Sequence, residues 1–161
     1  MSKKVTLYGV LAAVGLVFSY VETLLPLSFI APGVKIGLAN GVALLLILKK
    51  DIKGAFLVNI IRILLLNLLF VHPFALIYSL SAGVISILIM WLVAKTEIFS
   101  AVGFSIIGAL THNLVQFAVA LILLGGGVWF YLPVLIFSAI ISGGIIGFLA
   151  KILDKKIKTF F

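Results

Sequence analysis

The sequence predicts an all-α polytopic membrane protein, a bundle of six transmembrane helices. Hydrophobic residues make up 65% of its 161 residues and charged residues only 10%, with a mean hydropathy of +1.44. A soluble domain needs a far larger polar surface, so this class is excluded. The length allows about six spans of ~20 residues with short connections. We therefore expect residues 1–161 to form a single transmembrane domain.

Apolar runs between charged residues and helix breakers place the six predicted helices. They lie near residues 5–25, 33–48, 52–71, 73–94, 99–124 and 130–153. The first run has no convincing small-residue cleavage site before Pro26. We therefore expect it to be a retained span and not a removed signal peptide.

The basic residues predict how the bundle sits in the membrane. Six spans place both termini on one side of the membrane. Ten of the twelve basic residues, all except Lys35 and Arg62, fall on that side. They are Lys3, Lys4, Lys49, Lys50, Lys53, Lys95, Lys151, Lys155, Lys156 and Lys158. The positive-inside rule makes both termini cytoplasmic in the cell membrane. The net charge of +8 is therefore a topology signal among membrane lipids, and we expect no nucleic-acid partner.

A turn and restart at Pro32-Gly33 interrupts the apolar sequence before the second predicted helix. The run from Ile36 to Leu48 has 13 residues, or roughly 20 Å of helix against a hydrocarbon core of about 30 Å. Either the helix begins at the surface with Lys35 in its first turn, or the stretch before it dips into the membrane. Such interrupted segments mark transporter sites, since free N–H groups at a helix start attract anions. The alternative is a loop lysine that reaches lipid phosphate.

Two further charges, Glu22 and Arg62, fall within predicted spans. Arg62 lies ten residues above the inner end of its helix, about 15 Å up, where an arginine costs at least ~3 kcal/mol to insert. A ligand site explains such a residue. A structural ion pair between Arg62 and Glu22 is the alternative, because intramembrane charges pair with one another.

Polar side chains on other helices extend this candidate site. In the fifth helix His112, Asn113 and Gln116 share neighbouring parts of one face. The predicted substrate-binding residues are Glu22, Lys35, Asn40, Arg62, His112, Asn113 and Gln116. They predict an outward-opening funnel that is floored by Arg62 and walled by helices 1, 2, 3 and 5. We expect Arg62 and Lys35 to bind the anionic part of the ligand.

Small residues at four-residue spacing predict two places where helices can approach closely. The first helix carries Gly9 and Ala13, and the last carries Ala139, Gly143 and Gly147. For the last helix we expect packing within the bundle. For the first helix, packing and docking of another protein both stay open.

The motifs resemble those of a known family. They are Tyr20-Val21-Glu22-Thr23-Leu24-Leu25-Pro26, Pro32-Gly33-Val34-Lys35-Ile36-Gly37-Leu38-Ala39-Asn40, Asn59-Ile60-Ile61-Arg62, His112-Asn113-Leu114-Val115-Gln116 and Tyr131-Leu132-Pro133. They are similar to the heptaprenyl diphosphate synthase component I family, also called the Gx transporter family. In size and layout this family is similar to the substrate-binding S components of energy-coupling-factor vitamin transporters. That likeness implies an S-component-like fold, a transmembrane coupling subunit and two ABC-type ATPases as partners, with Gly9 and Ala13 as the docking groove.

Catalysis is not expected of this chain. Prenyl chain elongation needs clustered carboxylates to hold magnesium against a diphosphate. The four acidic residues, Glu22, Asp51, Glu97 and Asp154, are far apart in the sequence, and there is no cysteine. We expect no catalytic residue, metal or cofactor, and the absence of a nucleotide-binding loop places any ATPase on another chain.

The function that we expect is capture of a small anionic, partly hydrophobic compound, such as an isoprenoid or quinone precursor or a vitamin. A partner ATPase complex would drive its uptake. The alternative is a non-catalytic membrane accessory subunit of a prenyl diphosphate synthase.

Overall fold

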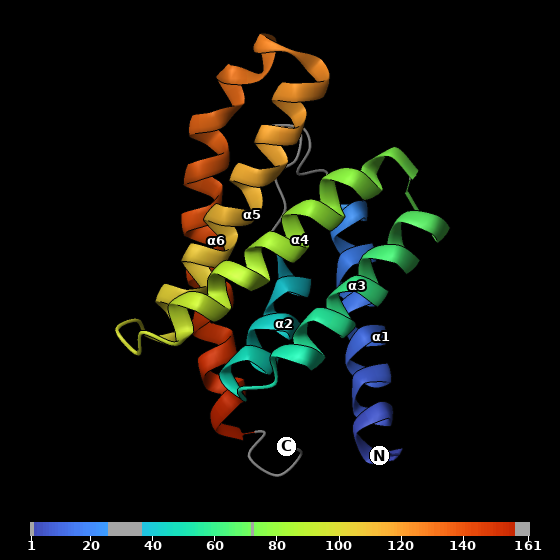
Figure 1. Ribbon diagram of the computed structural model, residues 1–161, viewed down its shortest axis with the longest axis vertical. Coiled ribbons are helices and arrows are strands. Elements are labelled where there is room, and N and C mark those ends of the chain that lie inside the picture. The colour runs from blue at the N-terminus through green and yellow to red at the C-terminus, as the bar shows by residue number, and fades with distance from the viewer. Residues whose placement is uncertain (1, 26–36, 72, 157–161) are drawn as a thin grey trace.

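The computed structural model describes residues 2–25, 37–71 and 73–156, and within them the protein is entirely helical (Figure 1). The elements are α1 (Ser2–Leu24), α2 (Leu38–Leu48), α3 (Ile52–Leu69), α4 (Pro73–Ala94), α5 (Ala101–Leu124), a 3₁₀ helix η2 (Gly126–Tyr131) and α6 (Leu132–Lys156). Five helices are long and apolar enough to cross a membrane, and α2 is the shorter exception. The predicted all-α, six-helix membrane fold is confirmed.

The start of α2 differs from the prediction. Gly37 precedes the helix with φ of 80° and ψ of 22°, the left-handed conformation that favours glycine, so the helix begins at Leu38 and not near residue 33. Residues 33–36 lie outside the described part. The 11 residues of α2 cover roughly 16 Å, about half of a hydrocarbon core. The stretch before Gly37, on which the two predicted alternatives depend, lies outside the described residues.

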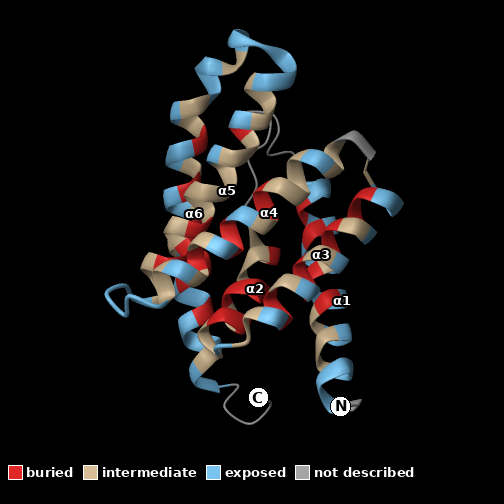
Figure 2. Ribbon diagram, viewed as in Figure 1, coloured by how far each residue is buried: buried red, intermediate tan, exposed pale blue. Residues whose placement is uncertain are grey.

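The short helix α2 lies at the centre of the bundle. It contacts each of the other five α-helices, while α1 packs on α3, α3 on α4, α4 on α5, and α5 on α6 (Figure 1). Its side chains Leu44 and Leu46 are almost fully buried. Buried positions lie along α2 and on the neighbouring helices (Figure 2). An apolar helix enclosed on all sides has no need of a polar face, which is why its sequence is aliphatic almost throughout.

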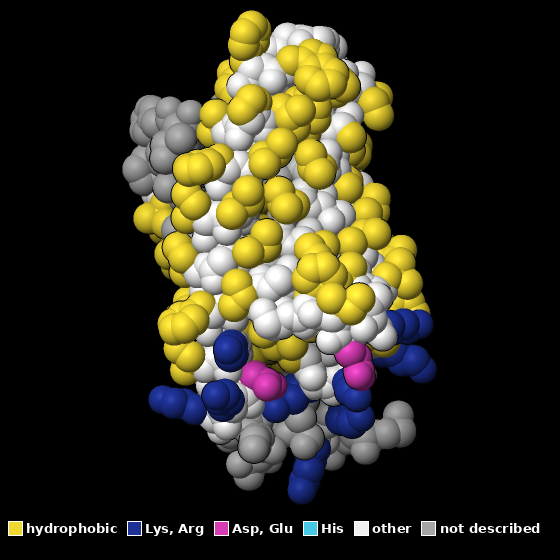
Figure 3. All heavy atoms as spheres, turned by 90° about the vertical axis from the view of Figure 1, so that its left-hand side faces the viewer, with side chains coloured by type: hydrophobic (Ala, Val, Ile, Leu, Met, Phe, Trp, Pro, Cys, Tyr) yellow, Lys and Arg dark blue, Asp and Glu magenta, His cyan; other side chains and the backbone are white. Residues whose placement is uncertain are grey.

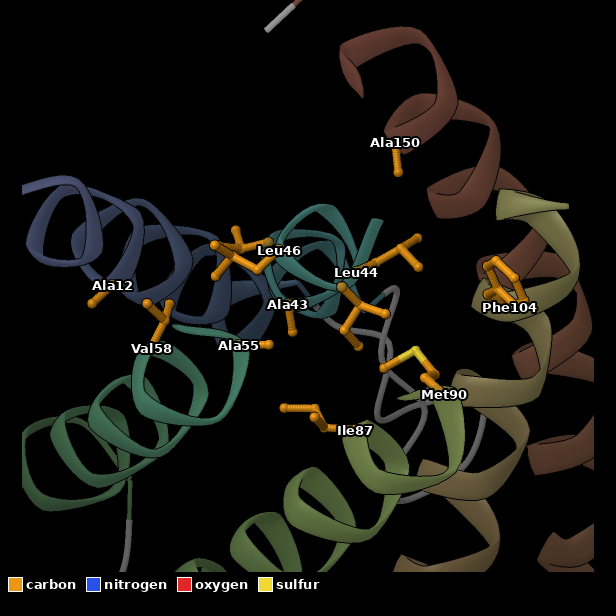
Figure 4. Close-up of a cluster of buried hydrophobic side chains, with 12 residues drawn as sticks. Ala12, Ala43, Leu44, Leu46, Ala55, Val58, Ile87, Met90, Phe104 and Ala150 are labelled. Atoms are coloured by element: carbon orange, nitrogen blue, oxygen red, sulfur yellow. The ribbon is translucent and has the colours of Figure 1, made fainter. Parts of the chain in front are cut away.

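An aliphatic core fills the half of the bundle between Asn40 and the end of the molecule where α1 begins and α6 ends. Leu44 and Leu46 of α2 meet Val58 of α3, Ile87 of α4 and Phe104 of α5 there (Figure 4). This packed apolar cluster lies between the residues around Arg62 and the opposite end of the described bundle.

The small residues of α6 pack against α5, as predicted. A Cβ added at Gly147 would lie 2.6 Å from Val102 Cα, and one at Gly143 would lie 2.8 Å from Ile106 Cα. Only glycine permits so close an approach of two backbones. On α1, by contrast, Gly9 and Ala13 are exposed, and a Cβ at Gly9 would meet nothing within 4 Å.

Charged side chains gather at one end of the bundle, where α1 begins and α6 ends (Figures 1 and 3). Two contacts tie the helices together there. Tyr8 of α1 donates a 2.5 Å hydrogen bond to Asp51, the residue that caps α3, and Lys49 forms a 3.0 Å ion pair with Asp154 of α6. Above this end, the face in Figure 3 is covered by hydrophobic side chains, as a lipid-facing surface should be.

Candidate functional site

A small cavity with both apolar and polar lining lies among all six α-helices. Its volume is about 60 Å³, room for about two water molecules at ~30 Å³ each, whereas sites for drug-sized ligands have about 300–1,000 Å³. Its polar lining comprises Ser19, Glu22, Asn40, Arg62, Ser79, Ser86, Ser105, His112, Asn113 and Ser142. The predicted funnel was therefore incomplete, because α4 and α6 also form its wall.

Arg62 of α3 is the central cation of the cavity and is only 7% exposed. Its Nη1 donates to Ser19 Oγ of α1 at 2.7 Å, and its Nη2 donates to Asn59 Oδ1 at 2.5 Å and to Asn40 Oδ1 of α2 at 3.4 Å. Its Nε is buried and has no hydrogen-bond partner within the described residues. All three oxygens belong to neutral groups, so they orient the guanidinium without neutralising its charge.

Glu22 holds the start of α2 against α1. Its Oε1 accepts a hydrogen bond from the backbone N–H of Leu38, in the first turn of α2. A carboxylate at this place satisfies an N–H group that the helix itself leaves free, and it complements the positive end of the helix dipole. Glu22 thus supplies a negative charge at the start of α2 and bonds one of the N–H groups of its first turn.

Arg62 and Glu22 belong to one electrostatic unit. Both side chains are buried and line the same cavity, so their opposite charges lie close to one another. Buried charges persist in an apolar bundle only when other charges and hydrogen bonds compensate for lost water. The guanidinium forms no direct ion pair with Glu22 within the described residues, and its hydrogen-bond partners are instead Ser19, Asn40 and Asn59.

The remaining predicted residues are distributed unevenly. His112 and Asn113 line the cavity, and Asn113 Nδ2 donates to Leu135 O of α6 at 2.9 Å. Gln116 is half-buried and is not among the described residues that line the cavity. Lys35 lies outside the described residues. The structure therefore brings together Glu22, Asn40, Arg62, His112 and Asn113 of the predicted set.

Sequence reasoning missed the serines of the cavity. Ser19 lies one helical turn before Glu22 and could have been found by that spacing. Isolated serines such as Ser86 in apolar helices gave no such signal, since they resemble groups that bond their own helix. Ser86 does so, donating to Gly83 O at 3.1 Å. The described residues contain no group of three or more His, Cys, Asp or Glu side chains that could hold a metal ion.

Long apolar helices around a buried, charged cavity define a polytopic α-helical membrane protein. The family described as heptaprenyl diphosphate synthase component I matches residues 11–153, and the chain belongs to this family. The resemblance seen in the motifs is confirmed to that extent. No curated protein and no solved structure matches the chain.

Proposed function

We propose that this membrane protein is the substrate-capture subunit of an uptake system and resembles the S components of energy-coupling-factor transporters. It binds a small anionic, partly hydrophobic compound from outside the cell, such as an isoprenoid or quinone precursor or a vitamin. A partner coupling subunit and two ABC-type ATPases drive delivery of this compound into the cell.

The observation that carries the proposal is the setting of Arg62. A cation that is buried near the midplane, oriented by three neutral oxygens and beside a cavity can donate its remaining Nη1 hydrogen to a carboxylate or phosphate. Its unpartnered Nε provides one further donor. A purely structural arginine has no need of an adjoining cavity with polar side chains from six helices.

The size of the cavity limits what enters it without rearrangement. About 60 Å³ admits only a few atoms of a ligand. A ligand with a hydrophobic part therefore requires the helices around the cavity to separate. We expect the first turn of α2 to be the part that moves. In this proposal it lies inside the membrane, and the hydrogen bond from the Leu38 N–H to Glu22 would have to break for it to move away from α1. The segment before it carries Lys35, a second cation for the ligand.

The exposed groove at Gly9 and Ala13 supports docking of a partner helix. Small residues spaced by four present a flat surface to another membrane helix, and on α1 that surface is not covered by the described part of the bundle. The chain carries no nucleotide-binding loop, so ATP hydrolysis belongs to another subunit.

Mass spectrometry of the purified protein tests the proposal. We expect a small anionic compound to co-purify with the wild-type protein and to be absent from Arg62→Lys, because an ammonium does not reproduce the planar, two-pronged donor. Equal recovery of the same compound from both proteins would contradict it.

The description of the family favours a second candidate, a non-catalytic membrane accessory subunit of a prenyl diphosphate synthase. Under this alternative the protein associates stably with a soluble synthase and raises its turnover, and association with ATPases is not expected. Affinity purification from the native membrane followed by identification of the bound proteins distinguishes the two.

A further inference from the structure

A second cavity, independent of the proposed transport function, lies at the basic end of the bundle. Its volume is about 330 Å³, several times that of the central cavity and within the range typical of small-molecule sites. It lies between two connections that follow helix ends, the α2–α3 turn and the turn after α4. Its lining comprises Ile47, Lys50, Ile52, Trp91, Ala94, Lys95 and Glu97.

Two lysines carry positive charge on the rim of this cavity. Lys95 Nζ lies over the ring of Trp91, 3.6 Å from its centroid, a cation–π contact that holds the ammonium in place. Neither Lys50 nor Lys95 forms an ion pair with another residue of the described ranges, whereas the neighbouring Lys49 is paired with Asp154. The cavity lining thus carries two cations that are not neutralised by an ion pair with a described residue.

Lys50 has a backbone conformation that glycine usually adopts. Lys50 has φ of 61°, and its N–H and that of Asp51 bond to Ile47 O and Leu46 O, which is the helix end that glycine usually occupies. Glu97 also has a left-handed backbone, with φ of 55°. Side chains are disfavoured in this conformation. Both rim residues keep a charged side chain where glycine would fit the backbone better.

Hydrophobic side chains place this cavity at the boundary of the lipid. Ile98 and Phe99, which directly follow Glu97, are exposed, Ile98 by 77%. The face in Figure 3 shows charged side chains only at its lower end, directly beneath the hydrophobic surface. A lipid lying against that surface would bring its head group to the level of the lysines.

We propose that this cavity binds the head group of a phospholipid that carries both a phosphate and an ammonium, as phosphatidylethanolamine does. Lys50 and Lys95 hold the phosphate, and Glu97 accepts hydrogen bonds from the ammonium. Trp91 and Ile52 cover the apolar part of the head group. The carboxylate is the basis for the expected preference, because it attracts the ammonium of a zwitterionic head group and partly offsets the attraction of the two lysines for a purely anionic one.

Native mass spectrometry of the detergent-purified protein tests this site, with phosphatidylethanolamine, phosphatidylglycerol or phosphatidylcholine added at equal concentration. We expect phosphatidylethanolamine to be retained best. Lys50→Gly and Lys95→Gln should each lower its retention about five-fold, the effect of one lysine near a lipid phosphate. Lys50→Gly suits the left-handed backbone, so the variant is expected to fold. Lys53→Gln, an exposed lysine outside the cavity lining, is the matched control and should leave retention unchanged.

Glu97→Gln tests the role of the carboxylate, and we expect it to abolish the preference for phosphatidylethanolamine over phosphatidylglycerol. Soluble phosphoethanolamine distinguishes a lipid from a free phosphate ester, and it should compete only weakly because it lacks the acyl chains. Unchanged retention in the Lys50→Gly, Lys95→Gln double variant would overturn the proposal. So would equal loss in Lys53→Gln, or full competition by phosphoethanolamine. An acidic polypeptide that co-purifies and is lost in the same variants while lipid retention is unchanged would assign the cavity to a protein partner instead.

Discussion

Arg62 Nη1 donates a 2.7 Å hydrogen bond to Ser19 Oγ, which joins α3 to α1 in the buried centre of the membrane domain. The two residues are 43 positions apart in the sequence, and both line the central cavity. Ser19 thereby fixes the direction in which the guanidinium points. This contact links the stability of the bundle to the geometry of the proposed site.

Ser19→Ala should destabilise the protein by about 1.5 kcal/mol or more, because it removes an acceptor from a buried charged donor. Ser142→Ala is the control, since Ser142 lines the same cavity but bonds weakly to Ala139 O of its own helix. Thermal unfolding in detergent compares the two. A loss no larger than the ~0.6 kcal/mol typical of neutral hydrogen bonds between membrane helices would contradict this role.

Gly147→Ala should destabilise the α5–α6 hairpin by about 1–3 kcal/mol, because the added methyl group would lie 2.6 Å from Val102 Cα. Gly144→Ala, three residues earlier on the same helix, is the control. A Cβ there meets nothing within 4 Å, so its effect should be within about 0.5 kcal/mol or slightly stabilising. Equal unfolding temperatures for the two variants would show that the close helix contact is wrong.

Gly9→Leu combined with Ala13→Leu should abolish co-purification of the coupling subunit and ATPases while leaving the fold and ligand binding intact. Both positions are exposed, so the larger side chains fill the groove without disturbing the bundle. Val14→Leu, at an exposed position on another face of α1, is the control. If the double variant still assembles as well as the wild type, docking lies elsewhere.

Single cysteines test the orientation, since the natural chain has none. An impermeant thiol reagent added to intact cells should label Phe130→Cys, at the exposed tip between α5 and α6, and spare Lys53→Cys at the basic end. Labelling of Lys53→Cys from outside would reverse the proposed topology.

The sequence was sufficient to predict the helices, because backbone groups in a membrane have no partner other than their own helix. It did not predict where α2 begins, since the left-handed turn at Gly37 leaves no periodic signal. The same small-residue spacing occurs at Gly9 on α1 and at Gly147 on α6, yet the first faces outward and the second packs against α5. Only the arrangement of the helices separates the two cases.

For the site, charge was the most informative signal. Arg62 and Glu22 stand out because buried charges are costly in apolar helices, and both line the cavity. The extent of the wall was not predictable, because serines on α4 and α6 look like packing residues in sequence. Gln116 shares a helical face with His112 in the sequence, but this spacing does not show how far along α5 the cavity reaches.

The most direct test of the central claim is ligand binding by the double variant Arg62→Leu, Glu22→Leu. Removing both charges avoids leaving one of them buried and uncompensated, so the protein should fold. We expect this variant to bind no ligand, and Arg62→Lys to lose about 2–5 kcal/mol of binding free energy, roughly 30-fold to several thousand-fold in affinity. The measurement is the affinity of each purified variant for the compound that co-purifies with the wild type. A double variant that retains near wild-type affinity would show that the two charges only hold the helices together.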